Sequence, residues 1–170
     1  MITLVIGGAR SGKSGFALSG ASAVNGNKAY VATAQAFDDE MKERIEKHRK
    51  ERSSDWQTFE EPLALSGLLN KIGTEYDAII VDCLTLWLSN QMMKNRDVMP
   101  EFEKLLSSIQ SCGGHIFLVS NEVGMGIVPG DAMSRRFRDL AGTINRRMAE
   151  TADTVFLVTA GIPLKIKGAD

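Results

Sequence analysis

The start of the chain contains the feature that most limits its possible folds. A short apolar run over residues 2–6 leads into a glycine-rich segment, which a helical pattern follows. The segment matches the pattern G-x-x-x-x-G-K-[ST] and consists of Gly7, Gly8, Ala9, Arg10, Ser11, Gly12, Lys13 and Ser14. Glycines allow backbone angles that other residues avoid, so successive N–H groups can point at phosphate oxygens. The position between a strand and a helix favours a phosphate-binding loop over a chance glycine turn.

This loop predicts roles for two of its side chains. Lys13 is expected to contact the β- and γ-phosphates of a nucleoside triphosphate, and the Ser14 hydroxyl is expected to bind Mg²⁺. A carboxylate that holds the same ion is expected at the end of another buried strand, and Asp82 follows the apolar residues 78–81. The alternative role for Asp82 is to cap the helix that begins near Leu84. Because the loop implies a metal–nucleotide complex, we favour the metal role.

Short apolar runs alternate with helix-length segments along the whole chain. The expected strands are residues 2–6, 28–33, 76–81, 115–120 and 154–159, and the expected helices are residues 13–24, 38–52, 62–73, 84–94, 99–112 and 131–152. Continuous apolar strands are typical of a sheet that helices cover on both faces, so we predict a three-layer α/β domain with a mostly parallel sheet. Apolar runs on both sides of Ala160 and Gly161 predict a C-terminal hairpin that adds an antiparallel edge strand. Residues 1–170 are expected to form one domain.

The longest expected helix, residues 131–152, carries an apolar stripe. Its members recur at steps of three and four residues and are Met133, Phe137, Leu140, Ile144 and Met148. Arginines lie mostly on the other faces of this helix. A solvated surface is the simpler interpretation of these arginines, and contacts to phosphates or to a neighbouring subunit are the alternative.

Composition excludes several classes of protein. The 20 Lys and Arg residues balance 21 Asp and Glu residues, and the net charge of −1 argues against a dedicated nucleic-acid binder. The 2 cysteines cannot by themselves form a zinc site, and they do not suggest a disulfide framework. No apolar run approaches the ~20 residues that span a bilayer, and no secretory signal opens the chain. We expect a cytoplasmic protein without a membrane span and without a nucleic-acid partner.

Charged residues dominate the expected helix 38–52, with acidic residues at its start and basic residues at its end. Met41, Ile45 and His48 share one face, and spacing alone favours a packed, structural role for the histidine. Cations surround it in the sequence, namely Arg44, Lys47, Arg49, Lys50 and Arg52. That many cations favour the uncharged imidazole, which is a suitable nucleophile toward phosphorus. Both roles remain open at this point.

These segments together resemble the bifunctional adenosylcobinamide kinase / adenosylcobinamide-phosphate guanylyltransferase family of cobalamin synthesis. Besides the phosphate loop, the resemblance rests on Ala32-Thr33-Ala34, Asp38-Asp39-Glu40-Met41, Arg44-Ile45-x-x-His48 and Trp56-x-Thr58-x-Glu60. Its most specific parts are Ser120-Asn121-Glu122-Val123-Gly124-Met125-Gly126-Ile127-Val128-Pro129 and Arg136-Phe137-Arg138-Asp139-Leu140-Ala141-Gly142-x-x-Asn145. The match runs over residues 2–167.

The resemblance implies a RecA-like P-loop fold, a homotrimer and two reactions. Members phosphorylate the terminal hydroxyl of the aminopropanol arm of adenosylcobinamide with ATP or GTP. They then transfer GMP from GTP to that phosphate through a GMP-histidine intermediate, which gives adenosylcobinamide-GDP and pyrophosphate. The position of that histidine matches His48. The nucleotide contacts of the family map onto Gly7 to Ser14, Ala32, Thr33, Ala34, Arg49, Lys50, Glu51, Arg52, Glu60 and Asp82.

A simpler enzyme remains the alternative. It is a P-loop kinase for another small alcohol, in which His48 has only a structural role.

Overall fold

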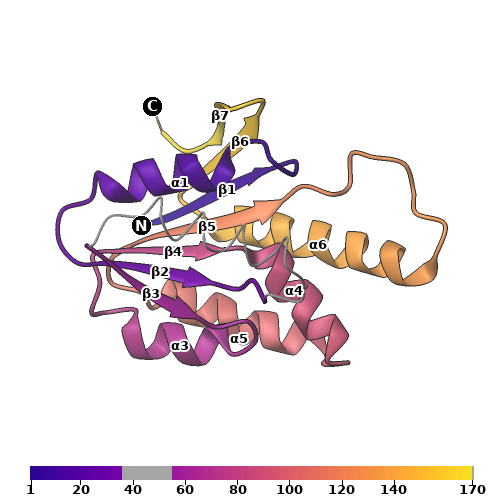
Figure 1. Cartoon of the computed structure of the whole chain (residues 1–170), viewed down its shortest axis with the longest axis horizontal. Coiled ribbons are helices and arrows are strands. Elements are labelled where there is room, and N and C mark those ends of the chain that lie inside the picture. Colours follow the sequence, from indigo (N-terminus) through magenta and orange to yellow (C-terminus); the bar gives the residue numbers. More distant parts are fainter. Residues whose placement is uncertain (36–54, 170) are drawn as a thin grey trace.

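Seven strands form one sheet through the middle of the molecule (Figure 1), and the computed structural model describes residues 1–35 and 55–169. The strands are β1 Ile2–Gly7, β2 Lys28–Ala32, β3 Trp56–Glu60, β4 Ala78–Asp82, β5 His115–Asn121, β6 Thr154–Thr159 and β7 Ile162–Lys167. Their order across the sheet is β3-β2-β4-β5-β1-β6-β7. Neighbouring strands are parallel except for β6 and β7, which pair in antiparallel fashion. The mostly parallel sheet and its C-terminal hairpin are confirmed.

Helices cover both faces of this sheet. They are α1 Lys13–Ser22, α3 Leu65–Ile72, α4 Leu84–Met93, α5 Val98–Gln110 and α6 Ala132–Thr151. Helix α1 packs on one face, whereas α3, α4, α5 and α6 pack on the other (Figure 1), as the three-layer prediction requires. Among the described residues, no helix combines the length and the hydropathy that crossing a membrane requires.

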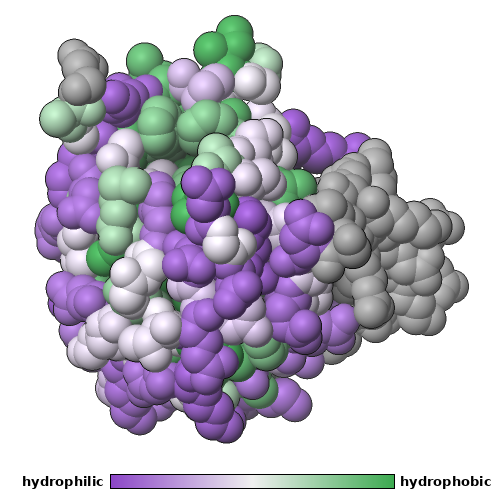
Figure 2. All heavy atoms as spheres, turned by 90° about the vertical axis from the view of Figure 1, so that its left-hand side faces the viewer, coloured by the Kyte–Doolittle hydropathy of each residue, from purple (hydrophilic) through white to green (hydrophobic). Residues whose placement is uncertain are grey.

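The hairpin leaves an apolar edge on the surface. Ile162, Leu164 and Ile166 of β7 are 70%, 59% and 53% exposed, because, within residues 1–35 and 55–169, β7 pairs only with β6 and no helix covers it. Figure 2, which views the left-hand side of Figure 1, shows hydrophobic residues in the upper part of the molecule, at the height of this hairpin in Figure 1. The lower part of the face in Figure 2 is mostly hydrophilic. Pro163 lies in this edge strand, where its missing N–H removes no hydrogen bond from the interior of the sheet.

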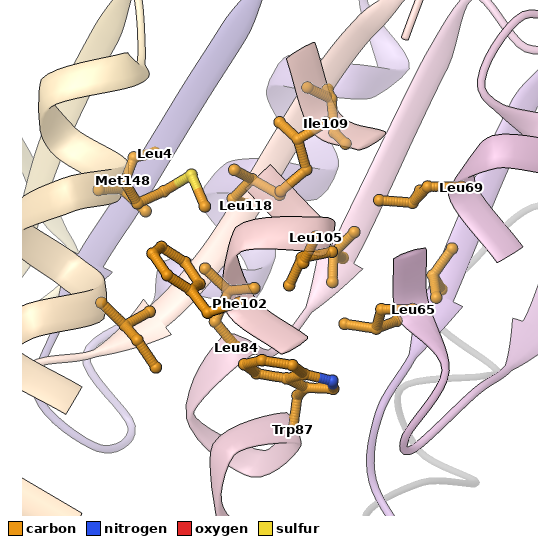
Figure 3. Close-up of a cluster of buried hydrophobic side chains, with 14 of the residues drawn as sticks. Leu4, Leu65, Leu69, Leu84, Trp87, Phe102, Leu105, Ile109, Leu118 and Met148 are labelled. Atoms are coloured by element: carbon orange, nitrogen blue, oxygen red, sulfur yellow. The ribbon is translucent and has the colours of Figure 1, made fainter. Parts of the chain in front are cut away.

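The central strands are mostly apolar at their buried positions because both of their faces meet helices, although Thr3 of β1 and Ser120 of β5 are buried polar residues. In β4, Ile79 and Val81 join the core beneath α3 to α6, whereas Ile80 faces α1. Figure 3 shows the larger core, in which Trp87 and Phe102 lie among leucines of α3, α4 and α5. Burying a side chain of this kind stabilises the fold by about 1.5–3 kcal/mol. The packed core therefore fixes the positions of the strand ends that form the site.

Strand β3 was not predicted from the sequence, and the structure corrects this omission. Residues Trp56 to Glu60 lie at the edge of the sheet and pair only with β2, so exposed Gln57 and Glu60 interrupt the apolar pattern. A continuous apolar run is a signal for central strands, and an edge strand does not need one. The other described strands and helices end within three residues of their predicted bounds. The predicted helix 38–52 lies outside the described residues.

The apolar stripe of α6 is confirmed only in part. Ile144 and Met148 are buried, but Met133 is 71% exposed. The N-terminal part of α6 extends beyond the edge of the sheet in Figure 1, so its first turns have no strand to pack against. Arg147 forms an ion pair with Glu103 of α5.

Candidate nucleotide site

The carboxyl ends of the parallel strands bring the predicted nucleotide-binding residues to one edge of the sheet. Gly7 at the end of β1 is opposite Asn121 of β5, and Asp82 at the end of β4 is opposite Ala32 of β2. Glu60 at the end of β3 is in turn opposite Ala32. Ligands of open α/β sheets bind at this edge because strand ends and helix starts meet there. The topology thus gathers residues from distant parts of the sequence into one candidate site.

The phosphate loop needs glycine at two positions for different reasons. A side chain at Gly7 would collide with the Val158 carbonyl oxygen of β6. Gly12 has φ +98°, a left-handed angle that L side chains rarely adopt, and it directly precedes α1. Arg10 also has a positive φ, 56°, and its side chain is exposed. The loop therefore follows the strand–loop–helix path that the sequence predicts.

Lys13 is held against this loop. It is 6% exposed, and its Nζ donates hydrogen bonds to the Gly8 carbonyl oxygen at 2.5 Å and to Ser11 Oγ at 3.5 Å. Ser14 lies beside it in the first turn of α1 and is half-buried. The ammonium group and the helix N-terminus together place positive charge at the loop, which suits a phosphate group.

Asp82 has a partner other than the helix that follows it. Its Oδ2 accepts a hydrogen bond from the Tyr30 hydroxyl at 2.7 Å. The N-cap of α4 is Cys83, whose Sγ accepts a hydrogen bond from the Leu86 N–H at 3.4 Å. The capping role that competed for Asp82 in the sequence therefore belongs to its neighbour, and Tyr30 orients the Asp82 carboxylate.

The donor set at this edge suits Mg²⁺ rather than a protein-caged metal. The Asp82 carboxylate and the Ser14 hydroxyl are oxygen ligands, which Mg²⁺ prefers. In the part of the chain that the structure describes, no group of three or more His, Cys, Asp and Glu side chains could hold a metal ion. A magnesium ion of this kind is bound by one or two side chains and by substrate phosphates, so two oxygen ligands fit it.

Thr33 lies in the wall of the site rather than on its surface. It is fully buried, and its Oγ1 donates to the Cys83 carbonyl oxygen at 2.8 Å and accepts from the Cys83 N–H at 2.7 Å. Its carbonyl oxygen accepts a hydrogen bond from Asn90 Nδ2 at 2.9 Å. Thr33 thus joins the ends of β2 and β4, and sequence reasoning missed its buried partner Asn90. The flanking Ala32 and Ala34 are half-buried at the same edge.

A buried polar network at the end of β5 was also missed. Ser120 Oγ donates to Asn145 Oδ1 at 2.6 Å, and Asn145 Nδ2 donates to the Asn121 carbonyl oxygen at 3.0 Å. Thr85 Oγ1 accepts from the Asn121 N–H at 2.6 Å and lies 3.2 Å from Ser120 Oγ. Polar residues inside the apolar faces of α4 and α6 are the sequence signal for this network. Both backbone groups of Asn121 are therefore held by side chains from two helices, α4 and α6, that cover the same face of the sheet.

Other predicted residues are more exposed or lie elsewhere. Glu60 is exposed at the end of β3. His48 and the four residues Arg49, Lys50, Glu51 and Arg52 lie outside the described residues. The loop between β5 and α6 is exposed, and it carries apolar side chains at Met125, Ile127 and Val128 that are 81%, 97% and 61% exposed.

The family model for cobinamide kinase / cobinamide phosphate guanyltransferase matches residues 3–166. The chain belongs to this family. It is 43% identical to the bifunctional adenosylcobalamin biosynthesis protein CobP of Pseudomonas aeruginosa, with 99% of this chain and 98% of that protein covered. It is 39% identical to the bifunctional adenosylcobalamin biosynthesis protein CobU of Salmonella typhimurium, with 98% of this chain and 100% of that protein covered. The expected family and its pair of enzyme activities are thus confirmed.

Two solved structures support the RecA-like fold. The flagellar accessory protein FlaH of Methanocaldococcus jannaschii has a TM-score of 0.57 at 13% identity, covering 98% of this chain and 78% of that chain. The RadB recombinase has a TM-score of 0.52 at 16% identity, covering 92% of this chain and 73% of that chain. At such low identity these likenesses establish the fold alone.

Proposed function

We propose that this enzyme performs two successive reactions at the carboxyl edge of its sheet. In the first, it phosphorylates the terminal hydroxyl of the aminopropanol arm of adenosylcobinamide with ATP or GTP. In the second, it transfers GMP from GTP to the new phosphate and releases pyrophosphate, which leaves adenosylcobinamide-GDP. Family membership supports the pair of reactions, and the observation that carries the site is that the phosphate loop and Asp82 lie at the same edge of the sheet.

The described side chains support the first reaction through charge and position. Lys13 holds an ammonium group at the loop, where it can neutralise the β- and γ-phosphates as the bond between them breaks. The Ser14 hydroxyl and the Asp82 carboxylate would hold Mg²⁺, which supplies further charge neutralisation when bound. Tyr30 keeps the Asp82 carboxylate in one orientation. Phosphoryl transfer depends mainly on such positioning and electrostatic stabilisation.

The second reaction requires a nucleophile that attacks the α-phosphorus of GTP. We assign this role to His48, which forms a bond to the GMP phosphorus while pyrophosphate leaves. Glu60 and the four residues that follow His48 complete the proposed guanine-nucleotide contacts; these four are Arg49, Lys50, Glu51 and Arg52. The same loop, Gly7 to Ser14, with Ala32, Thr33 and Ala34, binds the nucleotide in both reactions.

Labelled GTP tests this assignment directly. Incubation with GTP labelled at the α-phosphate should leave acid-labile label on the wild-type protein and none on His48→Ala. The His48→Ala variant should still phosphorylate adenosylcobinamide, whereas Lys13→Ala should lose about 100-fold or more in both reactions because it removes a phosphate contact that both share. Lys104→Ala is the matched control, since Lys104 is exposed on α5 and pairs with Glu101. Absence of label on the wild-type protein would favour a simple kinase of another alcohol.

We further propose that the protein is a cytoplasmic homotrimer in which residues 1–170 act as one domain. The resemblance to the family supports the assembly. Light scattering on the purified protein measures its mass in solution, and a mass of one chain would contradict a trimer.

A further inference from the structure

Strand β5 lies between the strand that ends in the phosphate loop and the strand that ends in Asp82. Its last residue, Asn121, is opposite Gly7 of β1, and Val119 is opposite Asp82 of β4. Glu122 follows the strand and therefore enters the edge of the sheet between the loop and the Asp82 carboxylate. In a nucleotide-bound enzyme, we expect the γ-phosphate and its acceptor to meet in this region, because it lies between the end of the phosphate-loop strand and the proposed metal-binding carboxylate.

Two hydrogen bonds fix Glu122 in this place. Its backbone N–H donates to the Gly7 carbonyl oxygen at 2.9 Å, which ties the residue to the start of the phosphate loop. Its Oε1 accepts a hydrogen bond from the Gly124 N–H. A Cβ at position 124 would lie 2.9 Å from that oxygen, so a side chain there would displace the carboxylate. Glu122 is half-buried, and its carboxylate is thus held at the end of β5 by its own loop.

The buried network behind Asn121 holds the same place from the other side. Thr85 and Asn145 bind the N–H and the carbonyl oxygen of Asn121, the residue directly before Glu122. Both are nearly fully buried, at 6% and 7% exposure, so water competes little for these hydrogen bonds. The position of Glu122 relative to Gly7 is therefore built into the fold.

Other carboxylates at this edge have different commitments among the described residues. Glu61 Oε1 accepts hydrogen bonds from the N–H groups that precede α3. Asp82 binds the Tyr30 hydroxyl and is the proposed metal ligand. Glu60 ends β3, which β2, β4 and β5 separate from β1. Glu122 is left as the carboxylate beside the phosphate-loop strand.

We infer that Glu122 is the general base of the phosphorylation step, an inference that rests on the proposed function. The substrate hydroxyl oxygen forms a bond to the γ-phosphorus while its proton passes to the Glu122 carboxylate. The bond from the γ-phosphorus to the bridging oxygen breaks, and the electron pair leaves with the nucleoside diphosphate. The Glu122 carboxyl group then releases its proton to solvent.

Guanylyl transfer does not need this base. Its acceptor is a phosphate oxygen that already carries negative charge, so no hydroxyl proton has to be removed. The two reactions of one enzyme therefore separate a proton-transfer role of Glu122 from a structural role, which would affect both.

Glu122→Gln is the informative variant because glutamine keeps the shape and an oxygen for the Gly124 N–H but cannot accept the proton. Phosphorylation of adenosylcobinamide and guanylyl transfer to preformed adenosylcobinamide phosphate are measured on the same preparation. The kcat of phosphorylation should fall by about 100-fold or more, while guanylyl transfer stays near that of the wild type. Glu75→Gln is the control, because Glu75 is exposed at the opposite edge of the sheet, before β4, and should leave both reactions unchanged.

Retention of phosphorylation in Glu122→Gln would overturn the inference, and so would an equal loss of both reactions. Glu122→Asp, which keeps a carboxylate on a shorter side chain, gives a second test if the glutamine variant folds poorly. It should keep guanylyl transfer near that of the wild type and retain part of the phosphorylation activity, and an equal loss of both reactions in a folded Glu122→Asp protein would overturn the inference. A wild-type protein without either activity would instead overturn the proposed function.

Discussion

At the carboxyl edge, two charged residues act on one buried thiol. Burial is the main cause that raises the pKa of Cys83 from 9.0 to about 11, and the negative charge of Asp82 adds to it. The positive charge of Lys13 acts in the opposite direction, so the two charged residues of the site lie close enough to affect the same group. Cys83 is consequently a neutral N-cap near the charges of Asp82 and Lys13, and its thiol is unreactive near neutral pH.

This shift predicts that the protein loses stability in alkaline solution. Between pH 9 and about 11 the unfolded chain releases the Cys83 proton while the folded protein keeps it, so the free energy of unfolding falls as pH rises. Below pH 9.0 the thiol is protonated in both states and contributes no pH dependence. From a shift of this size we expect a loss of about 2 kcal/mol by pH ~11.

Urea denaturation in reducing buffer at pH 8 and pH ~10.5 measures this effect. Wild type is compared with Cys83→Ala, because other groups titrate in both proteins and cancel. Cys83→Ala should lose less stability over this interval. An equal decline in the two proteins would show that the thiol does not carry the effect.

Two helices on the same face of the sheet, α4 and α6, meet where β5 ends. Asn145 of α6 and Thr85 of α4 reach the backbone of Asn121 from different helices, and Ser120 connects them. Hydrogen bonds in such a buried network leave costly unpaired groups when one member is removed. The packing of α4 and α6 therefore determines where the strand end lies relative to the phosphate loop.

Asn145→Ala should reduce both stability and activity. It leaves the Ser120 hydroxyl and the Asn121 carbonyl oxygen without this partner, and we expect the free energy of unfolding to fall by about 1–3 kcal/mol. Because Asn121 precedes Glu122, the KM for nucleotide should also rise and the rate of phosphorylation should fall in the folded variant.

Thr143→Ala on the same helix is the control for this prediction. The Thr143 hydroxyl donates to the exposed Asp139 carbonyl oxygen of its own helix at 2.9 Å, so the change should stay within about 0.5 kcal/mol. Equal stability of the two variants would contradict the importance of the network.

At the scale of the whole molecule, the C-terminal hairpin lies against the phosphate loop that follows the first strand. Strand β6 pairs with β1, and the turn that follows it reaches the phosphate loop. The Gly161 N–H donates to the Ser11 carbonyl oxygen at 2.9 Å, and a Cβ at Gly12 would lie 3.3 Å from the Gly161 Cα. The C-terminal hairpin thus supports the loop that binds phosphate, besides adding an edge to the sheet.

Gly161→Val should weaken this support. Gly161 has φ +81°, and no atom lies within 4 Å of a Cβ built there, so the cost is backbone strain rather than a collision. We expect the free energy of unfolding to fall by about 1–2 kcal/mol and nucleotide binding to weaken. Denaturation and nucleotide titration measure the two effects.

Gly142→Ala provides a control with the opposite sign. Gly142 lies inside α6 with open space around it, so alanine should stabilise the protein by about 0.5–1 kcal/mol without changing nucleotide affinity. A Gly161→Val variant with wild-type nucleotide affinity would show that the hairpin does not support nucleotide binding.

The sequence by itself determined the phosphate loop, the layered α/β fold, the terminal hairpin and the family. These follow from signals that neighbouring residues carry, such as the spacing of Gly12, Lys13 and Ser14 and the apolar run before Asp82. The sequence did not predict edge strand β3, because its pairing with β2, rather than an apolar pattern of its own, makes it a strand.

Only the tertiary structure decided how the edge of the sheet is built. It placed Glu122 beside Gly7, gave Thr33 a buried bond to Cys83 50 residues away, and joined Asn145 to Ser120. Hydrogen bonds between distant residues depend on strand order and register, which arise when the helices and the sheet pack together. Local sequence patterns indicate the helices and strands, whereas the packing of these elements determines which side chains meet.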